Sequence, residues 1–186
     1  ERPTPEIVNR TYRAMGTQVA FTAYTTEPVR AEGAFEAAIA EFRRLEDLLS
    51  NWRPKSDISR LNARAGVQPV EVAPETLELL EKAKAMARLT KGKFDVGFGA
   101  LADLWRFDHD QNNRVPEPAA VEARLPLVDV AALELDAERS TAYLPRAGMA
   151  IHVGGIGKGY AVDRAAKILR DRGFDNFMIQ AGGDLY

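Results

Sequence analysis

The chain has 186 residues, 46% of them hydrophobic, which is enough for one sizeable core. Its 25 basic and 27 acidic residues nearly balance, and no basic cluster exceeds what a solvated helix carries, so nucleic acid is not an expected partner. The mean hydropathy of -0.27 and the lack of a long apolar run argue against a membrane span, and the lack of cysteine excludes disulfides and thiolate metal sites.

The N-terminal part is predicted to contain an arm, a strand and a helix. Residues 1–10 are expected to form an extended arm, because two prolines disfavour helix there. Alternating apolar and polar residues predict a half-buried strand over residues 11–24, with Met15 in a bulge at its entrance. Apolar residues at three- and four-residue spacing predict an amphipathic helix over residues 30–49. Residues 11–186 are expected to belong to a single domain.

A polar loop is expected to follow this helix, and it contains an indole that does not fit the apolar pattern. Trp52 is interpreted either as a cap over the helix end or as a stacking platform for a flat ligand, because it lies between Asn51 and Arg53. Ser56 or Asp57 is predicted to cap a short helical turn just after it.

The middle of the chain is predicted to run from a short strand over residues 67–72 into a helix over residues 74–91 that starts at a proline. Two glycines break any helix over residues 94–98, so this stretch is predicted to be a loop. Asp95 stands between two apolar residues, where an unpaired carboxylate is costly to bury. It is interpreted equally as a turn carboxylate and as a hydrogen-bond acceptor for a ligand.

Further elements are predicted downstream. A surface excursion rich in Asp, Asn and Pro is expected over residues 107–120. The remaining predictions are a helix over 119–125, a hairpin of strands 131–136 and 140–145, a buried strand over 149–153, a helix over 161–169 that ends at Gly173, and a buried strand over 177–179.

The most informative stretch is IHVGGIGKG, residues 151–159, in which four glycines and a lysine separate an apolar run from a patterned helix. Glycines at such a turn let backbone amides approach an anion, and the helix N-terminus adds partial positive charge. Lys158 adds a full charge. The stretch is therefore interpreted as a nucleotide cradle, although it is not a P-loop and its glycines would also suit a tight packing turn.

Five motifs occur in order along the chain: MGT, SNWRPKSDISRLN, GKFDVGFGALADLW, GGIGKGYAVDRAAKILRDRG and QAGGD. Together they resemble the ApbE family of flavin transferases, roughly from Tyr12 to Asp184. The resemblance implies an α+β, T-fold-like architecture with a mixed or antiparallel sheet and packed helices, lacking its C-terminal portion here. It also implies bound FAD and a Mg²⁺-dependent transfer of FMN from FAD to a threonine hydroxyl of an acceptor protein, with release of AMP.

The resemblance assigns flavin contacts to several residues. Met15 would contact FAD at the strand entrance, and Trp52 would stack on the flavin or the adenine. The segment that would line the adenine side consists of Lys93, Phe94 and Asp95.

At the glycine turn, the resemblance makes Lys158 an FAD contact and the main-chain carbonyl of Gly155 a ligand of the metal. This chain has His152 where the family usually has an acidic residue that contacts FAD, and a neutral imidazole cannot replace a carboxylate as acceptor at both nitrogens. The family's downstream segment, which carries a metal-binding carboxylate and a threonine, lies beyond Tyr186, so the catalytic residues are expected there.

Two other functions fit the same motifs. An FAD pyrophosphatase would use water in place of the threonine, and a non-catalytic protein would only bind or present FAD. For the transferase, the expected acceptor is a flavin-bearing redox subunit, with membrane association of that partner left open. The family resemblance and the start at Glu1 in place of Met lead us to expect an exported protein, in the periplasm or at the cell surface, soluble or anchored as a lipoprotein.

Overall fold

The computed structural model describes residues 3–105 and 114–186. The chain forms two compact units, the first made of Glu1–Asp47 and Ile156–Tyr186 and the second of Leu48–Gly155. Part of the excursion expected over 107–120 lies outside the described residues. No helix in the described ranges is both long and apolar enough to cross a bilayer.

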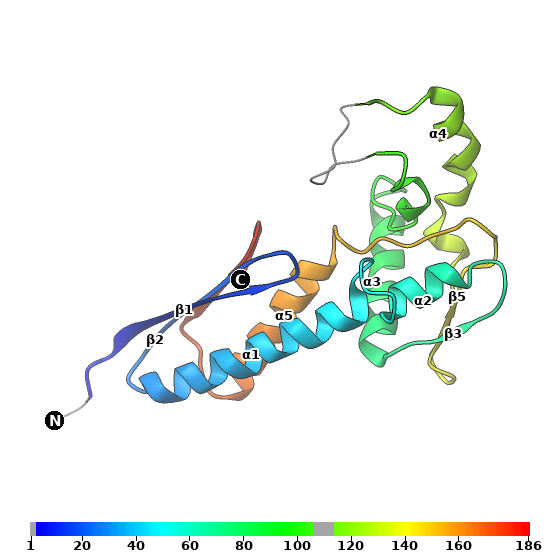
Figure 1. The fold of residues 1–186 in the computed structure, drawn as a ribbon. Coiled ribbons are helices and arrows are strands. Elements are labelled where there is room, and N and C mark those ends of the chain that lie inside the picture. The colour runs from blue at the N-terminus through cyan, green and yellow to red at the C-terminus, as the bar shows by residue number, and fades with distance from the viewer. Residues whose placement is uncertain (1–2, 106–113) are drawn as a thin grey trace. The chain divides into compact units, whose positions relative to one another are not determined.

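The first unit contains a four-stranded antiparallel sheet in the order β1-β2-β6-β7 (Figure 1). Every neighbouring pair in it is antiparallel, and β6 and β7 are joined by a tight turn at Gly182. The strands are β1 (Glu6–Ala14), β2 (Thr17–Thr25), β6 (Phe177–Ala181) and β7 (Asp184–Leu185).

The first two strands correct the expected bulge at Met15. Strand β1 already begins at Glu6, inside the predicted arm, and it pairs along its whole length with β2. Met15 and Gly16 form the two-residue turn between the strands, with φ angles of 50° and 69°. Positive φ at both positions is the geometry that matches the twist of a hairpin, so the MGT motif is a hairpin turn.

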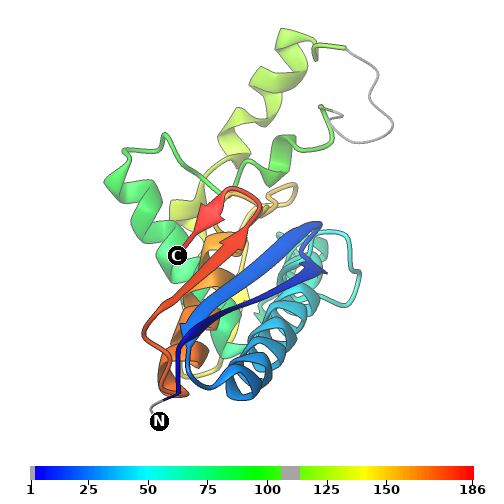
Figure 2. The same ribbon diagram turned by 90° about the vertical axis from the view of Figure 1, so that its left-hand side faces the viewer.

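Helices α1 (Pro28–Leu49) and α5 (Gly157–Asp171) provide the apolar partner of this sheet. Within the first unit both helices lie behind the strands in Figure 2. Phe21 of β2 stacks on Phe35 of α1 at 5.4 Å between ring centroids and meets Phe42 edge-on at 6.3 Å. All three rings are fully buried, so they form the centre of this core.

The ends of the sheet agree in part with the sequence. Gly173 follows α5 with a φ of 86°, as expected for the residue that ends a helix. Strand β6, predicted to be buried, is buried on one face only, because Met178 is 42% exposed. A fully buried strand would have both faces covered, whereas the face of β6 that carries Met178 is open to solvent.

The second unit combines short helices with a small antiparallel sheet in the order β3-β5-β4, whose helices and strands β3 and β5 are labelled in Figure 1. The predicted hairpin is confirmed, although its first strand starts three residues late because a 3-10 turn precedes it. The elements are α2 (Asp57–Ala63), β3 (Val70–Glu71), α3 (Pro74–Leu89), α4 (Pro118–Arg124), β4 (Glu134–Asp136), β5 (Thr141–Tyr143) and the 3-10 turns η1 (Gly99–Leu101), η2 (Leu125–Leu127) and η3 (Val130–Ala132).

A buried carboxylate joins two helices of this unit. Ser56 caps α2 by accepting a hydrogen bond from the Ser59 N–H at 3.0 Å. Asp57, 4% exposed, accepts from the Ala73 N–H and from the Thr76 hydroxyl, both at 2.7 Å. Because Ala73, the N-cap of α3, has no capping side chain, Asp57 satisfies donors at the start of that helix from a distance.

The strand predicted over residues 149–153 does not form. Its apolar residues are buried as expected, but the segment makes only one isolated parallel bridge, from Ala150 to Phe98. Asn62 replaces the missing strand partner, since its side chain accepts from the Ile151 N–H at 2.7 Å and donates to the Ile151 carbonyl at 2.9 Å. Asn51 donates to the same carbonyl at 2.7 Å. Side-chain amides therefore satisfy backbone groups that a strand would have paired.

Candidate functional site

The glycine turn runs from the second unit into the first, and the two units divide between Gly155 and Ile156. In the first unit, α5 begins at Gly157 with Lys158 in its first turn. Ile156, the N-cap residue, supplies no side-chain cap to the helix. The start of α5 thus combines helix-terminal amides with a lysine, the two features that attract an anion.

Two sheet turns lie against this helix start. A Cβ on Gly182 would stand 3.2 Å from the Thr17 hydroxyl and 3.6 Å from the Lys158 Cε, so the β6–β7 turn is packed between them. The Asp184 carboxylate lies 3.4 Å from where a Cβ on Gly159 would be. Two sheet turns that are distant from each other in sequence therefore lie against the first turn of α5.

Met15 belongs to the same end of the sheet and adopts a conformation that its side chain disfavours. Its φ of 50° lies in the left-handed region, where a Cβ crowds the following carbonyl. Asn or Gly would suit this turn better. A costly conformation at a hairpin turn next to Thr17 is the kind of feature that functional sites retain.

The second unit contains an aromatic pocket of about 680 Å³. Trp52 is 76% exposed and lines this pocket, so its ring does not form a buried cap over the helix end. Phe98, 42% exposed, and Trp105 add further aromatic surface. Three aromatic side chains around one opening are suited to a flat ring.

His152 also lines this pocket. Its ring centroid is 5.1 Å from that of Phe98, with the planes tilted by 45°. Its Nδ1 accepts a hydrogen bond from the Gly154 N–H at 3.2 Å, which identifies the neutral tautomer with the proton on Nε2. Burial lowers the pKa of this imidazole below its usual 6.5. The side chain therefore brings one N–H donor and no charge to the pocket.

The predicted adenine-side segment is organised around Asp95. Its carboxylate accepts from the Gly97 N–H at 2.7 Å and from the Val130 N–H at 3.1 Å, so it has the partners that burial demands and holds a turn together. Lys93 is exposed and Phe94 is partly buried. This geometry corresponds to the turn-carboxylate interpretation of Asp95.

Gly155, the expected metal ligand, lies beside Phe94, whose ring is 3.3 Å from where a Cβ on Gly155 would be. Within the described residues, no group of three or more His, Asp or Glu side chains is arranged to hold a metal ion. The acidic and imidazole side chains of the described residues therefore form no metal-binding cluster by themselves.

The structure thus gathers Met15 and Lys158 in the first unit and the other predicted residues in the second. Sequence reasoning did not single out Thr17, Gly182 or Asp184, although each stands in a quoted motif. It also did not select the pocket residues Asn51, Asn62, Phe98 and Trp105. The spacing of Phe98 and Trp105 within GKFDVGFGALADLW was the available signal, since both are aromatics in a glycine-interrupted stretch.

Solved structures with the same fold include ApbE proteins. The ApbE protein from Thermotoga maritima matches with a TM-score of 0.85 at 30% identity, over 97% of this chain and 58% of that chain. The flavin transferase ApbE from Vibrio cholerae matches with a TM-score of 0.87 at 25% identity, over 97% of this chain and 59% of that one. The expected α+β architecture is confirmed.

The ApbE family model matches residues 15–186, and the chain therefore belongs to the ApbE family. A curated relative from Klebsiella pneumoniae, named FAD:protein FMN transferase, is 30% identical over 92% of this chain and 53% of its own length. A relative of the same name from Treponema pallidum is 30% identical over 96% of this chain and 51% of its own. The chain thus spans about half the length of the curated relatives it matches.

Proposed function

We propose that the protein is an FAD:protein FMN transferase. The observation that carries the proposal is the start of α5, where Lys158 and the helix-terminal amides meet the Gly182 turn. Family membership and the names of the relatives support the same function. Within the second unit, the aromatic pocket at Trp52 is suited to a flat ring.

Phosphoryl transfer of this kind depends mainly on charge neutralisation and in-line positioning of the reacting groups, and less on covalent catalysis by the protein. In the proposed reaction, the oxygen of an acceptor threonine forms a bond to the FMN phosphorus, and the bond between that phosphorus and the bridging oxygen of the diphosphate breaks. AMP leaves with the bridging oxygen, and the threonine proton is released. Lys158 and the amides of α5 would stabilise negative charge on the diphosphate.

Mg²⁺ dependence is part of the proposal. A hard cation with oxygen ligands suits a diphosphate, and the Gly155 carbonyl would be one such ligand. Where it binds, the ion would supply further neutralisation of the phosphate charge.

The test uses the complete protein with FAD, Mg²⁺ and a threonine-bearing acceptor protein. Covalent flavin is read as fluorescence of the acceptor band in a denaturing gel, and AMP is measured in parallel. A fluorescent acceptor with equimolar AMP is expected. Equal release of FMN and AMP without any acceptor would replace the transferase by a pyrophosphatase, and FAD binding without AMP release would leave only a flavin carrier.

We extend the proposal to location and partner. The family resemblance supports an exported protein, at the periplasm or cell surface, that modifies a flavin-bearing redox subunit. Fractionation of cells that express the complete protein tests the location, and recovery in the cytoplasmic fraction alone would contradict it.

A further inference from the structure

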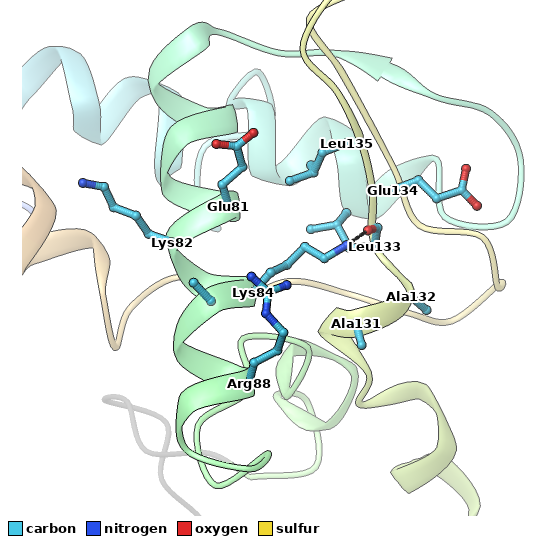
Figure 3. Close-up of a pocket in the computed structure, with 10 residues that line it drawn as sticks. Glu81, Lys82, Lys84, Arg88, Ala131, Ala132, Leu133, Glu134 and Leu135 are labelled. Carbon is cyan, nitrogen blue, oxygen red and sulfur yellow. Dashed lines mark hydrogen bonds between the residues drawn. The ribbon is translucent and has the colours of Figure 1, made fainter.

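A groove in the second unit separates α3 from the segment of η3 and β4 (Figure 3). Its volume is about 790 Å³. One wall is formed by the α3 residues Glu81, Lys82, Lys84, Ala85 and Arg88, and the other by residues 131–135. We call it the β4 groove. It shares no residue with the aromatic pocket at Trp52.

Strand β4 is the last strand of its sheet, so one of its edges has no partner strand among the described residues. The hydrogen bonds of β5 show which edge groups are open. The carbonyls of Ser140 and Leu144 accept from the Val72 and Gly66 N–H groups at 2.9 and 2.7 Å, on the β3 side. Since backbone direction alternates along a strand, Thr141 and Tyr143 turn toward β4.

The strand partners of Thr141 and Tyr143 are Asp136 and Glu134, which must therefore face back toward β5. Leu135, between them, directs its N–H and its carbonyl away from the sheet, into the groove that it lines. An open ladder position of this kind is the usual template for an added strand.

The neighbouring outward carbonyl confirms this direction. Leu133, two residues before Leu135, faces the same side, and its carbonyl accepts a hydrogen bond from the Lys84 ammonium, drawn as a dashed line in Figure 3. The helix therefore reaches the edge of β4 but satisfies only one of its outward groups.

On the helix wall of the groove, three basic side chains outnumber the one acidic side chain, that of Glu81. Lys84 and Arg88 are one turn apart on the same face of α3. Among the described residues, neither has a carboxylate partner. Lys82 also lines the groove and pairs with Glu78 at 3.1 Å, and Glu134 points away from α3 in Figure 3. Two cations thus stand beside an open strand edge.

We propose that the β4 groove binds an extended peptide segment of a partner protein, which adds as a strand to β4 and places a carboxylate against Lys84 and Arg88. Main-chain hydrogen bonds to Leu135 would give affinity, and the carboxylate would select the segment. The inference is independent of the proposed transferase activity.

The experiment measures fluorescence anisotropy of the labelled peptide Thr-Val-Glu-Val-Thr with the full chain. Three control peptides are used. One carries Lys in place of Glu, and two carry N-methyl groups on alternate residues, in the two possible registers, so that each blocks strand pairing on one edge. Binding of the acidic peptide is expected, with the Lys peptide and at least one of the two N-methyl registers about fivefold or more weaker. Equal binding of all peptides, or no binding of any, would overturn the proposal.

A matched pair of variants locates the binding site. Arg88→Glu in the groove is expected to weaken the acidic peptide about fivefold to tenfold and to improve the Lys peptide, whereas Lys55→Glu, at an exposed residue of the second unit that does not line the groove, leaves both unchanged. Equal effects of the two variants would contradict the assigned groove. If sedimentation shows a dimer that Arg88→Glu dissociates while no peptide binds, the occupant is a second copy of the chain and the peptide proposal fails.

Discussion

At the scale of single residues, Met15 is the clearest case of a side chain kept against its local preference. The hairpin turn that it forms with Gly16 demands φ angles that Asn and Gly adopt at little cost. Retaining Met there is consistent with the flavin contact that the family resemblance assigns to it.

We expect Met15→Asn to stabilise the fold by about 0.5–1 kcal/mol, because it relieves the left-handed strain. The same change should weaken FAD binding, since it removes the thioether. Thermal unfolding and flavin titration of one variant measure both effects. A variant that is more stable and binds FAD as tightly as before would reduce Met15 to a turn residue.

His152 brings a donor to the aromatic pocket where the family pattern places an acceptor. Its Nδ1 is occupied by the Gly154 N–H, and burial lowers its pKa below 6.5. Because the folded-state pKa is below the unfolded one, protonation favours the unfolded chain as pH falls below about 6.5.

We therefore expect nitrogen-detected NMR to find the Nε2–H tautomer of His152 at pH 7 and a titration midpoint below 6.5. The sequence has only one other histidine, so His109→Gln assigns the signals. A midpoint above 6.5, or the opposite tautomer, would contradict the geometry.

At the scale of elements, side-chain hydrogen bonds and ion pairs connect segments that share no backbone hydrogen bonds. Helices α1 and α5 are joined by Glu41, 12% exposed, which accepts from Arg44 at 2.8 Å and from Arg164 at 3.2 Å. The hydrogen bond from Arg44 is the main cause that lowers the pKa of Glu41 below its ordinary 4.5.

A carboxylate with a lowered folded-state pKa stabilises the fold above its unfolded pKa and loses that contribution as pH falls through the folded value. We expect Glu41→Gln to lower Tm at pH 7 and to have a shrinking effect below about pH 4.5. Tm measured from pH 7 to pH 3 tests this. A difference between the two proteins that stays constant over that range would contradict the ion-pair role.

The side chain of Asn62 connects α2 to residues 149–153, the segment that does not form the predicted strand. We expect Asn62→Ala to destabilise the protein by about 2 kcal/mol, because it leaves the buried Ile151 N–H without its acceptor. The control is Asn176→Ala on the surface, which should change little. Denaturant unfolding compares them, and equal midpoints for the two variants would show that Ile151 finds other partners.

At the scale of the whole molecule, the sequence predicted the helices with a periodic apolar face, but it did not predict which distant segments contact one another. The helices over 30–49, 74–91 and 161–169 were predicted because burial of one face imposes a 3.6-residue period. The missing strand at 149–153 was unpredictable from its apolar pattern, since Asn62, 89 residues away, decides its pairing. For the same reason the sequence pattern did not predict that Gly182 lies beside Lys158, because the β6–β7 turn brings them together in the folded chain.

In the proposed function, the first turn of α5 holds the diphosphate of FAD. Titration of FAD and riboflavin into wild-type protein, Lys158→Ala and the same-helix control Lys167→Ala tests it directly. We predict that Lys158→Ala weakens FAD binding by ~1.5–3 kcal/mol, leaves riboflavin binding unchanged, and is not matched by the control. Equal FAD affinity in all three proteins, or an equal loss for riboflavin, would contradict the claim.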